Sequence, residues 1–176
     1  MIHDNIQGWF DYDDFYDWIL LQYKTVVEIG AWKGKSAAYM GEMIMRREID
    51  MEYTVIDHFK GNSNSILHKT DDDIINRRLY QIFIKNIEPV KNYVNVIVGN
   101  SHKVYNRFED KSIDVLFIDG GHTYKEVKRD IMLWKPKVKH IIAGHDYYML
   151  GVNKAVNECL PDHTVFSRNT WIKRLS

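Results

Sequence analysis

Short runs of apolar, largely β-branched residues recur along the chain, and each is followed by a polar or glycine-containing turn. The runs cover residues 25–30, 53–57, 94–98, 113–118 and 140–143. Continuous apolar runs, unlike alternating ones, are typical of strands that are buried on both faces of a parallel sheet. We therefore predict a buried parallel strand at each of these positions.

Segments with helical character lie between these runs, at residues 35–48, 71–87, 101–109 and 123–134. Strand and helix thus alternate, which predicts a doubly wound α/β sheet with helices on both faces. A further helix, predicted within residues 11–23, carries acids in its first turn, where they suit the positive end of the helix dipole. We expect this helix to cap the sheet.

The end of the chain reads as two short strands, at residues 163–168 and 170–175, which predicts a closing antiparallel hairpin. With 176 residues and 45% hydrophobic content, the chain is long enough for one well-buried core and too short for two comfortable ones. We therefore predict a single domain. Its parts are a capping helix in residues 1–24, a cofactor-binding core in residues 25–158 and the hairpin in residues 159–176.

Charge and cysteine content limit the classes of function. The 24 basic and 24 acidic side chains balance, so the chain lacks the overall positive field that attracts nucleic acid phosphates. The single cysteine, Cys159, excludes an internal disulfide and a cysteine zinc cluster, which favours a reducing compartment. No secretion signal is legible at the start, and no apolar stretch approaches the ~20 residues of a membrane span. We expect a cytoplasmic protein that binds neither nucleic acid nor membrane.

Residues 25–34 join an apolar run to an acid and then to a glycine turn that opens a helix: Thr-Val-Val-Glu-Ile-Gly-Ala-Trp-Lys-Gly. A second acid, Asp57, ends the next apolar run, and this order is typical of nucleoside-binding α/β folds. Binding of a dinucleotide favours a glycine where Trp32 stands, so the turn argues against a pyrophosphate ligand. S-adenosylmethionine contains adenosine without phosphate, and therefore suits this turn better.

Glu28, Gly30 and Gly34 are predicted to shape the turn, and Asp57 to accept hydrogen bonds from the ribose hydroxyls. The alternative is an ordinary buried strand followed by a glycine turn, because short motifs also occur by chance. A polar segment at residues 60–70 follows Asp57 directly. This segment is either a lid over the cofactor or a passive connection.

Four titratable side chains follow the last two apolar runs. Asp119 and His122, separated by two glycines, come after the fourth run, and His145 and Asp146 come after the fifth. The carboxyl ends of neighbouring parallel strands meet at one edge of a sheet. We therefore expect the four side chains to gather around one crevice.

Four ordered motifs in this sequence resemble the class I S-adenosylmethionine-dependent methyltransferases, and specifically the small subfamily with an aspartate-glycine-x-histidine motif. The motifs are Val27-Glu28-Ile29-Gly30 with Gly34-Lys35-Ser36, Ile118-Asp119-Gly120-Gly121-His122-Thr123-Tyr124, Gly144-His145-Asp146-Tyr147 and Gly151-Val152-Asn153-Lys154-Ala155-Val156. The resemblance implies a Rossmann-like sheet of seven mostly parallel strands. It also implies methyl transfer to an oxygen, often of a sugar or another hydroxylated small molecule.

The resemblance further implies a binding site for S-adenosylmethionine, with Asp119 contributing both to this site and to catalysis. The implied cofactor residues are Glu28, Gly30, Ala31, Gly34, Ser36, Asp57, Asn100, Ser101 and Asp119. Asn100 and Ser101 would hold adenine, although both residue types also favour helix starts. His122 stands where similar enzymes carry the base that removes the hydroxyl proton, and imidazole titrates near neutral pH. A histidine that merely caps a turn is the alternative.

Some similar enzymes bind magnesium through an aspartate after the fourth strand and two adjacent residues after the fifth. These positions correspond to Asp119, His145 and Asp146. His145 departs from the pattern, because magnesium prefers oxygen ligands, and the sequence therefore argues against a requirement for magnesium. In the alternative interpretation, Asp146 accepts backbone amides of the following turn and His145 packs beneath it.

Together these features predict a methyltransferase that acts on a hydroxyl of a sugar or another small metabolite. One rival is a nucleoside-binding module without chemistry. Another is a nicotinamide-dependent oxidoreductase, which Trp32 disfavours. The sequence does not identify the acceptor, and it leaves open whether the chain forms a homo-oligomer.

Overall fold

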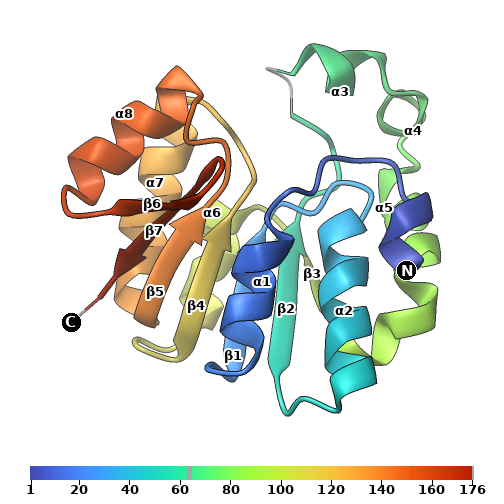
Figure 1. The fold of residues 1–176 in the computed structure, drawn as a ribbon. Helices are drawn as coiled ribbons and strands as arrows, with labels where there is room; N and C mark the ends of the chain where they lie inside the picture. The colour runs from blue at the N-terminus through green and yellow to red at the C-terminus, as the bar shows by residue number, and fades with distance from the viewer. Residues whose placement is uncertain (63–64, 176) are drawn as a thin grey trace.

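The computed structural model describes residues 1–62 and 65–175, and its centre is a seven-stranded sheet in the order β3-β2-β1-β4-β5-β7-β6 (Figure 1). The strands are β1 (Thr25–Ile29), β2 (Glu52–Asp57), β3 (Asn95–Val98), β4 (Ile113–Ile118), β5 (Val138–Gly144), β6 (Thr164–Ser167) and β7 (Thr170–Arg174). Strands β1 to β5 pair in parallel, whereas β7 pairs antiparallel with both β5 and β6. The predicted Rossmann-like, mostly parallel sheet is confirmed.

Helices cover both faces of this sheet. The α-helices of the described residues are α1 (Asp13–Leu20), α2 (Lys35–Arg47), α3 (Ile66–Thr70), α4 (Asp72–Ile75), α5 (Leu79–Ile87), α6 (Ser101–Val104), α7 (Tyr124–Trp134) and α8 (Leu150–Cys159). Short 3-10 helices are η1 (Ile2–Asn5), η2 (Glu88–Tyr93), η3 (Tyr105–Arg107) and η4 (Lys135–Lys137). In Figure 1, α3 and α4 form an excursion beyond the carboxyl ends of the strands.

Some helical segments differ from the sequence prediction. The helix predicted at 71–87 is divided into α4 and α5, because Arg77 between them adopts a left-handed backbone with φ 57°. The helix predicted at 101–109 is shorter, since α6 continues as the 3-10 helix η3. Helix α8 was not predicted, and its glycine and asparagines give it little intrinsic helix preference.

Two hydrophobic cores lie on opposite faces of the sheet. Val26, Val115 and Phe117 pack in the core with α1, α2 and α5, and all three are fully buried. Their neighbours in the chain, such as Val27 and Leu116, pack in the core with α7 and α8. Side chains alternate across a strand, so a strand buried on both faces needs apolar residues at every position. This arrangement is the physical origin of the continuous apolar runs.

The end of β1 lies against the end of β4 at Gly30. This residue has φ 93°, and a Cβ atom there would stand 2.2 Å from the backbone oxygen of Asp119. Only glycine accommodates both this left-handed backbone and this close approach. The glycine turn and Asp119 therefore border the same crevice at the carboxyl edge of the sheet.

Candidate active site

A cavity of about 190 Å³ opens at the carboxyl ends of β1 to β4. Among the residues predicted to hold a cofactor, those that line it are Gly30, Ala31, Asp57, Asn100, Ser101 and Asp119. The cavity is also lined by residues that sequence reasoning did not select, including Trp32, His58, His68, Glu126 and Asp130. Glu126 and Asp130 are four residues apart on α7, and this helical spacing was the one available signal for that pair.

Asp57 holds the glycine turn in shape. Its Oδ2 atom accepts the backbone N–H groups of Ala31 and Trp32, at 2.9 and 3.1 Å. Its Oδ1 atom accepts the N–H of Phe59 at 2.7 Å. Each carboxylate oxygen has two acceptor positions, so these bonds leave capacity for a ribose hydroxyl at the cavity edge. The ribose contact stays a prediction.

Glu28, Gly34 and Ser36 lie beneath the turn and do not line the cavity. The carboxylate of Glu28 is fully buried, and it accepts hydrogen bonds from the hydroxyls of Ser36, at 2.6 Å, and Tyr53. Burial raises the pKa of Glu28 to about 7, although the hydrogen bonds from these two hydroxyls act in the opposite direction. Gly34 packs against Phe83 with φ 86°. The structure thus gives these residues a supporting place under the turn.

Asn100 and Ser101 combine a structural contact with a place on the cavity wall. The side chain of Asn100 accepts the N–H of His102 at 2.9 Å and thereby caps α6. Ser101 donates its hydroxyl to Asp130 at 2.6 Å. The capping alternative therefore holds for Asn100, while the predicted contact of both residues with adenine is untested.

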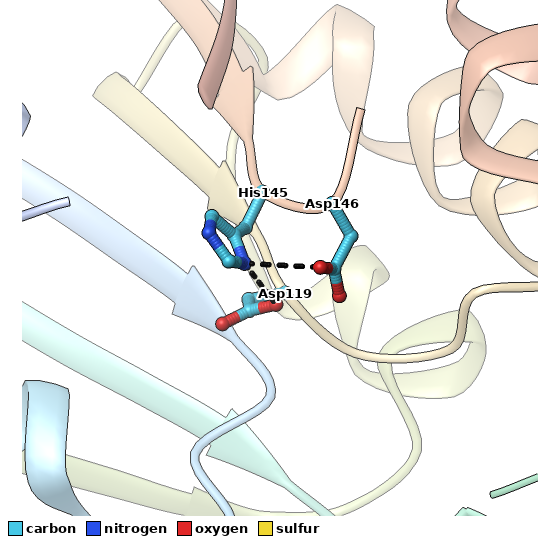
Figure 2. Close-up of side chains that lie close together, drawn as sticks. All are labelled: Asp119, His145 and Asp146. Carbon is cyan, nitrogen blue, oxygen red and sulfur yellow. Dashed lines mark ion pairs between the residues drawn. The ribbon is translucent and has the colours of Figure 1, made fainter. Parts of the chain in front are cut away.

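The four titratable side chains after β4 and β5 lie together, as expected. His122 Nε2 lies 3.1 Å from Asp146 Oδ2 and 4.0 Å from Asp119 Oδ1. His145 Nδ1 lies 3.4 Å from Asp146 Oδ1 and 3.8 Å from Asp119 Oδ1 (Figure 2). Asp146 therefore stands between the two imidazoles, with one carboxylate oxygen toward each. We name Asp119, His122, His145 and Asp146 the polar cluster.

Asp146 combines a left-handed backbone with a buried carboxylate that lies near a second carboxylate. Its backbone is left-handed, with φ 58°. Burial raises the pKa of Asp146, and the nearby Asp119 carboxylate raises it further, whereas His122 and His145 lower it. A carboxylate oxygen of Asp119 and one of Asp146 lie within 4.8 Å of each other, and two carboxylates at this separation repel each other unless a positive charge lies between or beside them. The polar cluster is therefore suited to hold a proton or a cation.

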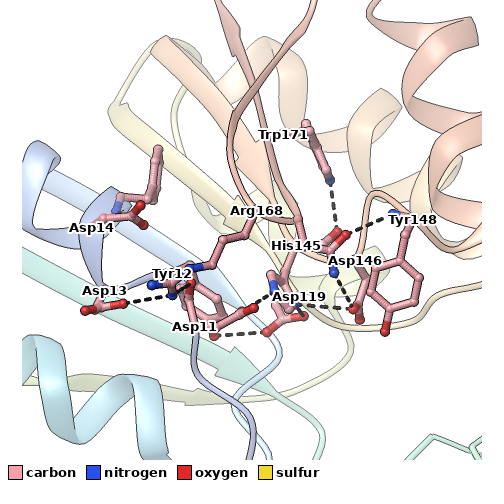
Figure 3. A network of polar contacts seen from close by, with 12 residues as sticks. Asp11, Tyr12, Asp13, Asp14, Asp119, His145, Asp146, Tyr148, Arg168 and Trp171 are labelled. Atoms are coloured by element: carbon pink, nitrogen blue, oxygen red, sulfur yellow. Dashed lines mark hydrogen bonds and ion pairs between the residues drawn. The ribbon is translucent and has the colours of Figure 1, made fainter.

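Two residues from the segment before α1 reach the polar cluster (Figure 3). Asp11 Oδ1 lies 2.6 Å from His145 Nε2, and the Tyr12 hydroxyl donates to Asp119 Oδ2 at 3.0 Å. Sequence reasoning missed both, because an acid and a tyrosine just before a predicted helix indicate only a helix start. Asp11 and His145 are 134 positions apart in the chain, so no local pattern connects them.

Asp119, His145 and Asp146 each offer one ligand atom, and these atoms lie within 4.8 Å of one another. The donor set is one imidazole nitrogen and two carboxylate oxygens. Magnesium prefers an all-oxygen environment, so the magnesium site implied by the resemblance does not fit these residues well. Imidazole with carboxylates suits first-row transition metal ions better.

Residues 27–147 match the sequence model of the family described as "Methyltransferase domain". The chain belongs to this family. Its predicted identification as a class I S-adenosylmethionine-dependent methyltransferase is confirmed. A protein of Sinorhizobium fredii strain NBRC 101917 / NGR234, named "Uncharacterized protein y4gI", is 21% identical over 147 residues. The match covers 81% of this methyltransferase chain and 15% of that protein's length.

Solved structures of O-methyltransferases share the fold. The O-methyltransferase NovP superposes with a TM-score of 0.69 at 15% identity, covering 92% of this chain and 76% of NovP. CalS11, a TDP-rhamnose 3'-O-methyltransferase, gives 0.63 at 13% identity over 93% of this chain and 76% of CalS11. A Bacillus cereus O-methyltransferase in complex with SAH gives 0.61 at 13% identity, over 96% and 83% of the two chains. Such low identities establish the fold alone.

Among the described residues, no helix combines the length and the apolar character that crossing a membrane requires.

Proposed function

We propose that this methyltransferase transfers the methyl group of S-adenosylmethionine to a hydroxyl oxygen of a sugar or another small metabolite, with His122 as the general base. The observation that carries the proposal is the place of His122. Its imidazole is 32% exposed and lies 3.1 Å from Asp146 Oδ2. A carboxylate at this distance orients an imidazole and stabilises the imidazolium that forms when it accepts a proton.

Bound S-adenosylmethionine would supply an electrophilic methyl group on its sulfonium. The chain's own residues would hold the acceptor oxygen in line with that methyl and remove its proton to His122. A bond between the methyl carbon and the acceptor oxygen would form as the methyl–sulfur bond broke, and S-adenosylhomocysteine would be the second product. Proton removal contributes roughly 10²- to 10⁴-fold, and positioning supplies much of the rest.

The location of the cavity supports this assignment. Asp119 belongs both to the cavity wall and to the polar cluster, lying 4.0 Å from His122 Nε2 through its Oδ1 atom. A methyl group presented at the Asp119 end of the cavity would lie near His122, whose Nδ1 would take the proton because its Nε2 faces the two carboxylates. The names of the structural neighbours support an oxygen acceptor, and that of CalS11 supports a sugar.

Isothermal titration calorimetry with S-adenosylmethionine and S-adenosylhomocysteine tests the cofactor assignment. We expect both to bind one site per chain, and NADH, the ligand of the rival oxidoreductase, to give no heat of binding. A folded sample that binds neither sulfur compound would contradict the proposal. Release of S-adenosylhomocysteine in the presence of monosaccharide and sugar nucleotide acceptors then separates an enzyme from a binding module without chemistry.

A further inference from the structure

We propose that Asp11 is a positioning residue that turns His145 toward Asp119 and Asp146, and that these three residues then bind a first-row transition metal ion in preference to magnesium. Asp11 precedes the residues 27–147 that match the family. The proposal concerns ion binding by the chain without cofactor. It therefore stands or falls separately from methyl transfer.

The contact between Asp11 and His145 determines which imidazole nitrogen carries the proton. Asp11 Oδ1 lies 2.6 Å from His145 Nε2, and an ionised carboxylate can only accept a hydrogen bond. The proton is therefore placed on Nε2. In the neutral ring this leaves a lone pair on Nδ1, which is the atom that faces the two other carboxylates.

The surroundings of Nδ1 favour a cation. His145 is 9% exposed, and the acceptors that face its Nδ1 lie 3.4 and 3.8 Å away. Both separations exceed the roughly 2.7–3.2 Å of a normal N–H···O hydrogen bond. A nitrogen lone pair directed at carboxylate oxygens is repulsive unless a positive charge lies between them. A shared divalent ion would provide that charge.

Each of the three ligand residues is also held by a side chain that is not itself one of the proposed ligands. Asp11 holds His145, the Tyr12 hydroxyl holds Asp119 at 3.0 Å, and Asn169 Nδ2 donates to Asp146 Oδ1 at 3.3 Å. Outer partners of this kind orient metal ligands in proteins, and losing one typically weakens metal affinity about 10- to 100-fold. The neighbouring residues Asp11 and Tyr12 thus support two ligands at once.

The segment that carries Asp11 is anchored independently of the cluster. Arg168, at the turn between β6 and β7, donates to the backbone oxygen of Asp11 at 2.5 Å (Figure 3). Tyr12 is 2% exposed and packs edge to face against Tyr16. Asp11 is therefore fixed in place by contacts with its backbone and its neighbour, and its carboxylate remains available to orient His145.

Binding of Mn²⁺ to the full chain tests the proposal, because free Mn²⁺ has a paramagnetic resonance signal that weakens on binding. We expect Asp11→Ala to weaken Mn²⁺ binding about 10- to 100-fold. Asp13→Ala removes the same charge two positions away, where the carboxylate is 52% exposed and lies 3.5 Å from Arg168. This control should bind Mn²⁺ as the unaltered chain does.

The choice of ion is tested with His145→Asp, which replaces the nitrogen ligand with oxygen. We expect the unaltered chain to favour Mn²⁺ and Zn²⁺ over Mg²⁺ strongly, and the variant to favour them less. Asp11→Asn, which keeps an acceptor oxygen, should lie between the unaltered chain and Asp11→Ala, and it replaces the latter if that variant does not fold. Failure of the folded chain to bind Mn²⁺, equal affinity for Mg²⁺, or full affinity in both Asp11 variants would overturn the proposal.

Discussion

The carboxyl ends of β1 and β2 differ from those of β4 and β5, although all four lie at the same edge of the sheet. At the first pair, the fold itself supplies donors to the acids. Glu28 accepts from two hydroxyls, and Asp57 accepts from the backbone of the glycine turn. At the second pair, Asp119 and Asp146 each accept one hydrogen bond from the fold, and in addition they face imidazole rings.

The acids at the ends of β1 and β2 therefore hold the backbone in shape, whereas those at the ends of β4 and β5 belong to groups that can take part in chemistry. A carboxylate whose oxygens are bonded to hydroxyls and amides of the fold stabilises one backbone geometry, because those donors cannot titrate near neutral pH. A carboxylate facing imidazoles belongs to a group that can gain or lose a proton, or take up a cation. The two pairs of strand ends should therefore respond differently to substitution.

The largest expected effect is that of His122→Ala, at the carboxyl ends of β4 and β5. Turnover should fall roughly 10²- to 10⁴-fold because the general base is lost. Affinity for S-adenosylmethionine should be unchanged, since His122 is not among the residues that line the cavity. Methyl-transfer rates on an identified acceptor, together with calorimetry of the cofactor, would measure both quantities.

His140→Ala is the matched control for that variant. His140 is 43% exposed and lies 3.7 Å from Asp114, near the opposite ends of β4 and β5. Its loss should leave turnover unchanged. Equal turnover of His122→Ala and the unaltered chain would contradict the role of His122 as the general base. It would also contradict the assignment of the chemistry to the ends of β4 and β5.

At the carboxyl ends of β1 and β2, Glu28→Gln should change how the free energy of unfolding depends on pH. Burial raises the pKa of Glu28 from 4.5 to about 7, so the folded chain binds this proton more tightly than the unfolded chain does. The resulting stability is fully present below about pH 4.5 and is lost as the pH rises through 7. The loss amounts to about 3 kcal/mol, and an uncharged glutamine should not show it.

Thermal or urea unfolding between pH 5 and 8 measures this difference. The unaltered chain should lose stability over that range relative to Glu28→Gln. Glu52→Gln, at an exposed position at the start of β2, should follow the unaltered chain. Parallel profiles for Glu28→Gln and the unaltered chain would show that Glu28 does not take up its proton on folding.

The last of these effects concerns two glycines that both line the cavity. In Gly30→Ala, the left-handed backbone alone costs roughly 1–2 kcal/mol, and the new Cβ would stand 2.2 Å from Asp119 O. In Gly120→Ala, the nearest atom lies 3.4 Å away, at Ile29 Cγ2, which is an ordinary contact. Urea unfolding should therefore find Gly30→Ala clearly less stable and Gly120→Ala close to the unaltered chain. Equal stability of the two variants would mean that the approach of β1 to β4 is not tight.

The sequence by itself determined the sheet, its parallel character and the edge where function lies. The apolar runs predicted β1 to β5 because strands covered on both faces must be apolar throughout. Parallel connection then required the residues after β4 and β5 to meet, and His122 and Asp146 do lie 3.1 Å apart. These conclusions depend on hydrophobic periodicity and on the order of strands and helices, and both can be derived from the sequence.

Only the tertiary structure decided which partners the side chains take. It placed Glu28 under the turn, gave Asp57 the backbone amides of Ala31 and Trp32, and brought Asp11 to His145 across 134 positions. Local preferences act over a few residues, whereas these contacts depend on how segments that are distant in the chain pack together. For that reason the position of the crevice was predictable, and its internal hydrogen bonds were not.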